Sequence, residues 1–322
     1  MISAVNNLYY INCIFATIQV LQNMWMKNIA RWSKRVACAV VLGVCANVLY
    51  AADSLSLGIQ YSDENENKYI HPEGTIVATR FYIGDAGKNF YRKPVSGGSF
   101  ESFLLNLPVK PVGYMTHFYD GEEKSFDVQI GVLDVPMGEG DFMKSAGVLV
   151  KLRAEYLFSS KLYGRIHFNL VNGFVCSYSR WAAGFRLNDS YNSWIHATEQ
   201  DYSQKTFEEY LNSTYKFINT SSLAKEMTKV ELKDVKGGDV LIQSSHPGHA
   251  VIILDALFNE VDGVVKLMLA QGFSPTQEIE ILKNYEDGES PWFSVPLDAT
   301  DDTMIRTPQW TFYVKDLKRF TN

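Results

Sequence analysis

The chain has 322 residues, of which 46% are hydrophobic and 20% are charged, and its formal net charge at pH 7 is −6. This composition is that of a globular protein, and the length allows one large domain or two smaller ones. A net negative charge argues against nucleic acid and against an anionic lipid surface as partners, because both attract basic proteins.

The first 51 residues are expected to be a secretory signal peptide. Four Lys or Arg residues between positions 27 and 35 precede an apolar run over residues 36–50, which ends at Ala51-Ala52. This order is typical of secretory signals, and the run is shorter than the ~20 residues that a membrane-spanning helix needs. We therefore expect a secreted or periplasmic protein with no membrane attachment after signal removal. A lipid anchor at Cys45 is the less favoured alternative.

Three of the four cysteines, Cys13, Cys38 and Cys45, fall inside the predicted signal peptide. Cys176 is then the only cysteine of the mature chain, so an internal disulfide is not possible. Cys176 lies in a predicted strand, without the helix dipole that lowers the pKa of a thiol. We interpret it as a small core residue, with a reactive thiol as the alternative.

A loose polar segment is expected at residues 52–72, and a single α+β domain over residues 73–322. Ser99 is suited to the N-cap of a helix that ends at Pro108. The strongest helix signal runs from Asp141, a good N-cap residue, to about Phe158, and it places Ser145 in the first turn on the buried side. Strands are predicted over residues 75–82, 125–135, 165–171 and 173–179, and further helices over 206–219 and 222–227.

Three short apolar segments between Gly237 and Gln277 are separated by turn residues, which predicts three adjacent strands. If they are antiparallel neighbours, His249, which begins the second, and Gln271, which ends the third, can lie at the same end of the sheet. His249 is therefore a candidate general base, and Gln271 a candidate for fixing the tautomer of its ring. The alternatives are a structural histidine and a glutamine that holds the loop at 272–275.

Ser145 is the candidate nucleophile. The first turn of a helix carries partial positive charge on its unpaired amides, which can stabilise an oxyanion. A serine hydroxyl also needs a general base before it can react. The alternative is a small polar residue whose hydroxyl bonds a backbone carbonyl one turn back.

Other polar and aromatic residues suggest binding rather than chemistry. Trp181, Asn169 and Trp292 are candidates for contacts with a peptide or glycan, although aromatic side chains also serve as core material. His246 and His249 are separated by Pro-Gly and do not share a helical face, so no metal site is predicted. We see no phosphate-binding loop, and no cofactor is expected.

The chain resembles an uncharacterised secreted bacterial family, the domain of unknown function 4846, over nearly all of its mature length. The shared residues are Leu133-Asp134, Leu152-Arg153-Ala154-Glu155-Tyr156-Leu157, Ile166-His167-Phe168-Asn169, Asn172-Gly173-Phe174, Ser179-Arg180-Trp181, Gly238-Asp239-Val240, Pro247-Gly248-His249-Ala250-Val251, Leu269-Ala270-Gln271, Pro275, Gln277, Pro291-Trp292, Thr307-Pro308 and Trp310. The family has no established activity that the resemblance could carry over.

The core is also similar, more loosely, to papain-like and NlpC/P60-like cysteine hydrolases. The similarity lies in a helix, a Gly-Asp-Val strand, a histidine that opens the next strand and a polar residue on a third strand. It implies a papain-like fold with a central helix packed on an antiparallel sheet, and it implies a nucleophile at position 145, a base at His249 and an orienting residue at Gln271. The helix of the first family begins with a Gln-Cys-Ala-Asp-Ala pattern, where this chain has Lys-Ser-Ala-Gly-Val from Lys144 onward. Serine therefore stands where a cysteine is implied.

Two hypotheses follow for function. The first is a hydrolase or acyltransferase that acts on amide bonds, such as those of peptidoglycan stem peptides, through Ser145, His249 and Gln271. The second is a non-catalytic module of the same fold that binds a peptide or glycan of the cell envelope. Within the first hypothesis, Cys176 or Ser203 could replace Ser145 as the residue that acts with His249.

Overall fold

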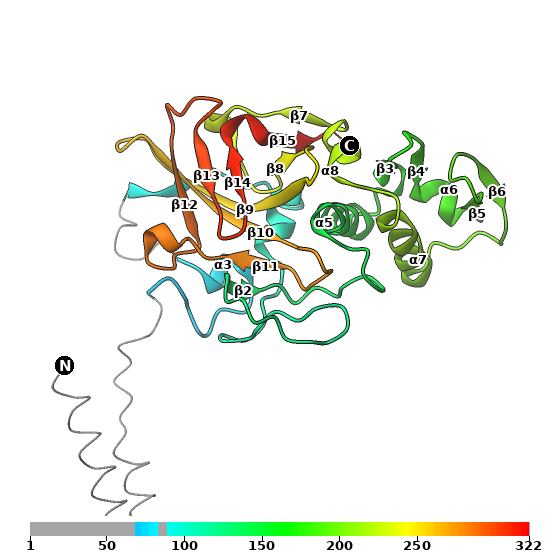
Figure 1. Ribbon diagram of the computed structural model, residues 1–322, viewed down its shortest axis with the longest axis horizontal. Helices are drawn as coiled ribbons and strands as arrows, with labels where there is room; N and C mark the ends of the chain where they lie inside the picture. Colours follow the sequence, from blue (N-terminus) through cyan, green and yellow to red (C-terminus); the bar gives the residue numbers. More distant parts are fainter. Residues whose placement is uncertain (1–67, 83–88, 322) are drawn as a thin grey trace, which may run out of the picture. The chain divides into compact units, whose positions relative to one another are not determined.

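The computed structural model describes residues 68–82 and 89–321 (Figure 1). The predicted signal peptide and most of the polar segment at 52–72 lie outside the described residues. Across those two ranges, no helix is long and apolar enough to cross a membrane.

A large antiparallel sheet lies at the centre of the described residues. Its strands are β1 (Tyr91–Arg92), β2 (Gln129–Val132), β7 (Met227–Lys229), β8 (Val240–Gln243), β9 (His249–Asn259), β10 (Val264–Gln271), β11 (Glu280–Leu282), β12 (Trp292–Pro296) and β15 (Leu317–Phe320). The order is β2-β11-β10-β9-β8-β15-β7, with β1 paired to β9 and β12 paired to β10. Every residue of β9 is buried, because both faces of this strand are covered, and this explains its continuous apolar run.

The helix α5 (Ser145–Ser159) packs on one face of the sheet, and Ala250 and Ala270 belong to the same buried cluster as its apolar side chains. Gly272 brings the end of β10 close to the first turn of this helix. A Cβ atom at Gly272 would lie 2.5 Å from Cγ2 of Val148. A residue larger than glycine would therefore require the Val148 side chain or the backbone to move.

The opposite face of the sheet is covered by a second apolar cluster, which includes Phe312 of a small hairpin. This hairpin consists of β13 (Met304–Arg306) and β14 (Thr311–Tyr313). The remaining short elements are α3 (Val77–Arg80), α4 (Phe100–Leu105), α8 (Thr220–Ala224) and the 3-10 helices η3 (Tyr163–Arg165), η4 (Leu232–Asp234), η5 (Tyr285–Asp287) and η6 (Val314–Asp316).

Residues 163–215 form a lobe beside α5, on the side away from the main sheet (Figure 1). We call it the aromatic lobe, because rings such as those of Tyr178, Phe207 and Tyr210 pack together inside it. Its elements are β3 (His167–Asn169), β4 (Val175–Ser177), α6 (Tyr178–Ala182), β5 (Phe185–Leu187), β6 (Trp194–His196) and α7 (Gln204–Tyr215).

The expected α+β class with a large antiparallel sheet is what the structure has, and most predicted elements are present within a few residues. The predicted cap at Ser99 is confirmed, since its side chain accepts a hydrogen bond from the Ser102 amide. The predicted strand at 75–82 is wrong. Its centre is the short helix α3, where the Arg80 guanidinium donates to the Gly74 and Lys110 carbonyls, at 2.5 and 2.9 Å. Tertiary hydrogen bonds here outweigh local β propensity.

The N-cap predicted at Asp141 lies three residues later in the structure, at Lys144. The Asp141 carboxylate accepts instead from the Thr276 amide at 2.6 Å and pairs with the Lys144 ammonium at 3.4 Å. It therefore fixes the loop after β10 rather than the helix end. As a result, Ser145 is the first residue of α5.

Candidate active site

His249 and Gln271 are hydrogen bonded to each other. Nε2 of His249 lies 2.8 Å from Oε1 of Gln271, and both residues are buried. The pairing of β9 with β10 is antiparallel and sets Ala270 opposite Ile252. The start of one strand therefore lies beside the end of the other, which brings together the two residues that the sequence suggested as base and orienter.

The direction of this bond follows from the other partners of Gln271. Its amide nitrogen donates to Oε1 of Glu280 at 2.9 Å and to Oε1 of Gln309 at 2.8 Å. A carboxylate can only accept a hydrogen bond, so the amide carbonyl must face His249. The imidazole therefore donates from Nε2, and in the neutral ring the lone pair is on Nδ1.

Burial lowers the pKa of His249 to about 4, and the bond to Gln271 opposes this shift with a smaller effect. The ring packs against Phe273, Trp310 and Phe312, with centroid distances of 5.1, 5.2 and 5.9 Å. These rings exclude water and so disfavour the charged imidazolium. At neutral pH the imidazole is neutral, and Nδ1 can act as a proton acceptor.

Ser145 stands at the N-terminus of a 15-residue helix whose first amides have no partner inside the helix. The first helical hydrogen bond is from the Val148 amide to the Lys144 carbonyl, and the Lys144 side chain makes no capping bond. The N–H groups of residues 145–147 thus carry the partial positive charge of the helix end. Such groups can stabilise a developing negative charge on a ligand oxygen.

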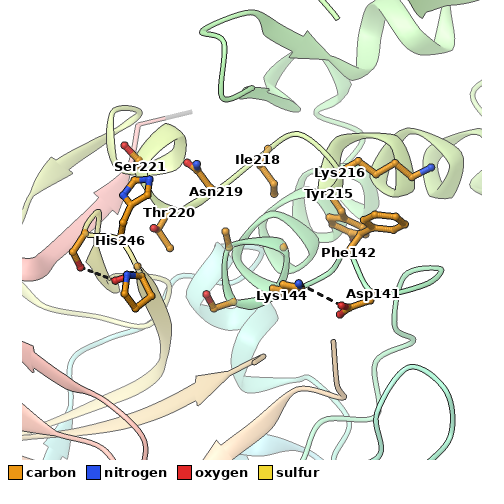
Figure 2. Close-up of a pocket in the computed structure, with 16 residues that line it drawn as sticks. Asp141, Phe142, Lys144, Tyr215, Lys216, Ile218, Asn219, Thr220, Ser221 and His246 are labelled. Carbon is orange, nitrogen blue, oxygen red and sulfur yellow. Dashed lines mark hydrogen bonds and ion pairs between the residues drawn. The ribbon is translucent and has the colours of Figure 1, made fainter. Parts of the chain in front are cut away.

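A pocket of about 360 Å³ lies at the start of α5 (Figure 2). Residues 144–147 line it from the helix, and Gly248, the residue before His249, lines it from the sheet. Figure 2 shows Phe142 and Lys216 on one side of it, and Ser221 and His246 on the other. Its volume is in the range of small-ligand sites.

The structure does not join Ser145 to the His249–Gln271 pair by a hydrogen bond between described side chains. Ala250 and Gly272 face α5, so the adjacent side chains of His249 and Gln271 project to the other face of the sheet. The imidazole can therefore meet the helix start only around the end of β9. Gly248 marks this place, since it lines the same pocket as Ser145.

The three predicted substrate contacts lie away from this pocket. Trp292 is only 1% exposed, and its Nε1 donates to the Tyr82 carbonyl at 3.0 Å. Trp181 is buried in the aromatic lobe with the Arg186 guanidinium over its ring. The backbone amide of Asn169 donates to the Glu226 carboxylate. We therefore leave these residues out of the proposed site.

The alternative nucleophiles are also away from it. Cys176 is fully buried, its Sγ is 3.7 Å from Oγ1 of Thr214, and burial raises its pKa to about 12. The interpretation of Cys176 as a core residue is confirmed. Ser203 is the N-cap of α7, where its hydroxyl accepts from the Thr206 amide at 3.3 Å.

Sequence reasoning missed the polar residues behind Gln271, which are Glu280, Gln309 and Lys124. Glu280 and Lys124 are 156 positions apart, and no local pattern links them. Within residues 68–82 and 89–321, no group of three or more His, Cys, Asp or Glu side chains could hold a metal ion.

The fold and site define an α+β protein with a His–Gln pair at one end of an antiparallel sheet and a helix start facing a pocket. The model of a family described as Domain of unknown function (4846) matches residues 78–319, so the chain belongs to this family. Comparison with curated proteins and with solved structures finds no match.

Proposed function

We propose that this protein has a papain-like core and is a relative of amide-bond hydrolases, with Ser145 in the nucleophile position. His249 is the general base and Gln271 orients it. The observation that carries the proposal is the hydrogen bond between Nε2 of His249 and Oε1 of Gln271, because it leaves Nδ1 as the basic nitrogen. Acyl transfer requires an oriented, neutral imidazole, and Gly248, the residue before His249, lines the pocket that Ser145 also lines.

The reaction would proceed through an acyl-enzyme. Oγ of Ser145 attacks the amide carbonyl carbon while its proton passes to Nδ1 of His249. The carbonyl oxygen becomes an oxyanion that the N–H groups of residues 145–147 stabilise. His249 then gives the proton to the amine nitrogen as the C–N bond breaks, leaving an ester on Ser145. Water, deprotonated by His249, cleaves this ester and releases the carboxylic acid.

The pocket supports a peptide as the substrate. Its lining combines hydroxyl groups, such as those of Thr220 and Ser221, with aromatic surface from Phe142 and Tyr215. Lys144 and Asp141 provide one cation and one anion at its edge. A short peptide carries backbone groups of both polarities, and with the expected secretion this points to the stem peptides of the cell wall.

The test uses Ser145→Cys, because a thiol at a helix start is acidified and a hydroxyl gains far less. Release of amine from soluble peptidoglycan peptides is measured for the wild-type chain, for Ser145→Cys and for Ser145→Cys combined with His249→Ala. We expect Ser145→Cys to be faster than the wild type, and His249→Ala to remove that activity. Turnover that survives His249→Ala would refute His249 as the base.

The second candidate function is a non-catalytic module that binds a cell-wall peptide or glycan in the same pocket. It is favoured by the serine at position 145 and by the lack of a hydrogen bond from this serine to His249 within the part of the chain that the structure describes. Here the wild-type chain and Ser145→Ala should bind a stem peptide equally tightly in calorimetry, and neither should cleave it. Cleavage by the wild-type chain would exclude this candidate.

A further inference from the structure

A buried ion pair lies directly behind Gln271. Nζ of Lys124 is 2.7 Å from Oε1 and 3.0 Å from Oε2 of Glu280, and the two side chains are 2% and 0% exposed. The ladder between β10 and β11 sets Glu280 directly opposite Gln271. The pair is therefore held in place by the sheet, next to the residue that contacts His249.

Both N–H groups of the Gln271 amide have acceptors in this network. One acceptor is Glu280 at 2.9 Å and the other is Gln309 at 2.8 Å. Oε2 of Glu280 also accepts from the Thr116 hydroxyl at 3.2 Å. Lys124 lies 3.5 Å from Oε1 of Gln309, which turns this oxygen toward the cation and toward the amide of Gln271.

The network allows only one orientation of the Gln271 amide. If the amide turned over, its carbonyl oxygen would lie about where its nitrogen is now and would face a carboxylate oxygen with no proton between them. A neutral partner at position 280, such as another amide, could donate as well as accept and would permit both orientations. The negative charge of Glu280 therefore favours one orientation of the Gln271 amide and disfavours the other.

We propose that Glu280, together with Lys124, is a positioning residue that fixes the tautomer of His249 through Gln271. Its effect on catalysis rests on the function proposed above, whereas the tautomer is a property of the folded chain. With Glu280 in place, Gln271 presents only an acceptor, Nε2 of His249 keeps its proton, and Nδ1 stays basic.

A purely structural role would not require these charges. Removing an ion pair from water is costly, and replacing both partners by uncharged groups is often neutral for stability. Removing one partner leaves an unpaired buried charge, which destabilises the fold. The effect of a single substitution on the tautomer could then not be separated from its effect on folding. The informative variant is Lys124→Met combined with Glu280→Gln, which removes both charges and keeps an amide opposite Gln271.

A matched control is available close to Glu280. Glu278 is also buried, and it pairs with Lys110 at 2.9 Å. Its carboxylate accepts from the His117 amide at 2.9 Å and makes no hydrogen bond to Gln271 among the described residues. Lys110→Met combined with Glu278→Gln removes the same two charge types beside the site without touching the network.

The experiment is ¹⁵N NMR of the histidine-labelled protein at pH 7, with His249 assigned by the signal lost in His249→Asn. Couplings between ring nitrogens and carbon-bound protons identify which nitrogen carries the proton. We expect a pure Nε2–H ring in the wild type and in the control variant, and a mixture with Nδ1–H in Lys124→Met/Glu280→Gln. A wild-type ring protonated on Nδ1 would overturn the proposal without any variant. A folded double variant that keeps a pure Nε2–H ring would also overturn it.

A separate kinetic experiment tests the effect of the Lys124–Glu280 pair on catalysis. In a Ser145→Cys chain that cleaves a peptide, adding Lys124→Met/Glu280→Gln should lower kcat about tenfold or more and leave KM unchanged, in line with the effect of orienting residues elsewhere. An unchanged kcat would contradict a role of the pair in catalysis. Absence of turnover in every Ser145→Cys chain would count against the proposed function, and the NMR result would still decide the tautomer.

Discussion

Ser145 and Cys176 are both small, buried side chains that can serve as nucleophiles, and they differ in the backbone and the space around them. Ser145 is the first residue of a long helix, with unpaired amides around it and a pocket of about 360 Å³ beside it. Cys176 is in a short strand of the aromatic lobe, fully buried beside Thr214 and Tyr210. The Cys176 thiol, which is the more nucleophilic group, therefore lies in the environment that makes it less reactive.

The comparison teaches that position in the fold, rather than residue type, decides where chemistry can occur. Burial also shifts the pKa of one titrating group in each region, and in both cases it favours the neutral form. At the end of the sheet, burial lowers the pKa of His249 to about 4 and so keeps a base neutral. In the lobe, burial raises the pKa of Cys176 to about 12 and keeps its thiol protonated.

The largest expected effect is on thiol reactivity. Ser145→Cys should react with iodoacetamide at pH 7 on the order of 100-fold faster than Cys176, because a helix start lowers the pKa of a thiol and a buried apolar site raises it. Mass spectrometry measures both rates in one sample. Ser245→Cys, in a loop that lines the same pocket, is the control for access alone. Equal rates at positions 145 and 245 would show that the helix end does not activate position 145.

The next effect is the pH dependence of stability that His249 contributes. The pKa is about 4 in the folded chain and about 6.5 when unfolded, so the unfolded chain binds more protons between these values. The stabilising contribution is complete above pH 6.5 and is lost as the pH falls toward 4, by up to about 3 kcal/mol. Denaturant unfolding of the wild type and of His249→Asn over pH 4–7 measures it. Parallel pH profiles of the two chains would contradict the burial of a neutral ring.

A smaller effect is expected for Cys176→Ser, which should cost about 1–3 kcal/mol of unfolding free energy, because a hydroxyl is more expensive to bury than a thiol. The matched change near the pocket, Ser145→Ala, should cost less, since this hydroxyl makes no hydrogen bond to another described side chain. Urea titrations at pH 7 compare the two. A larger loss for Ser145→Ala would reverse the roles assigned to the two regions.

A pH dependence of the opposite sign is expected for Glu226, whose carboxylate accepts from the backbone amide of Asn169 in the lobe. Burial raises its pKa to about 7, and the bond from Asn169 opposes this. A carboxyl group with a raised pKa destabilises the fold as the pH rises from 4.5 through 7. Glu226→Gln should therefore be more stable than the wild type at pH 8, and this gain should disappear by pH 5. A gain that is equal at both pH values would exclude ionisation as its cause.

Much of the frame of the site could be predicted from the sequence. His249 begins one apolar segment and Gln271 ends the next, with turn residues between them. Apolar segments bounded by turn residues predict strands well when the strands are long and buried. The same signals mislead at short elements. The segment at 75–82 has strand composition, yet Arg80 draws it into a helical turn by bonding two carbonyls.

What the sequence could not supply is the tertiary part of the site. The start of α5 depends on Asp141 bonding Thr276, a residue 135 positions away. The ion pair of Lys124 with Glu280 joins segments that are 156 positions apart. Trp292 has the composition of a binding residue and the burial of a core residue, and only the packed structure separates the two.

The central claim is that His249 acts on position 145, and the most direct test is the thiol pKa of Ser145→Cys with and without His249. The rate of alkylation is measured from pH 4 to 10 for Ser145→Cys and for Ser145→Cys/His249→Asn, with the corresponding pair at Ser245→Cys as control. We expect an apparent pKa well below the ordinary value of about 8.5, which rises when His249 is replaced, and no change at position 245. The same pH profile with and without His249 would contradict the claim and leave the pocket as a binding site only.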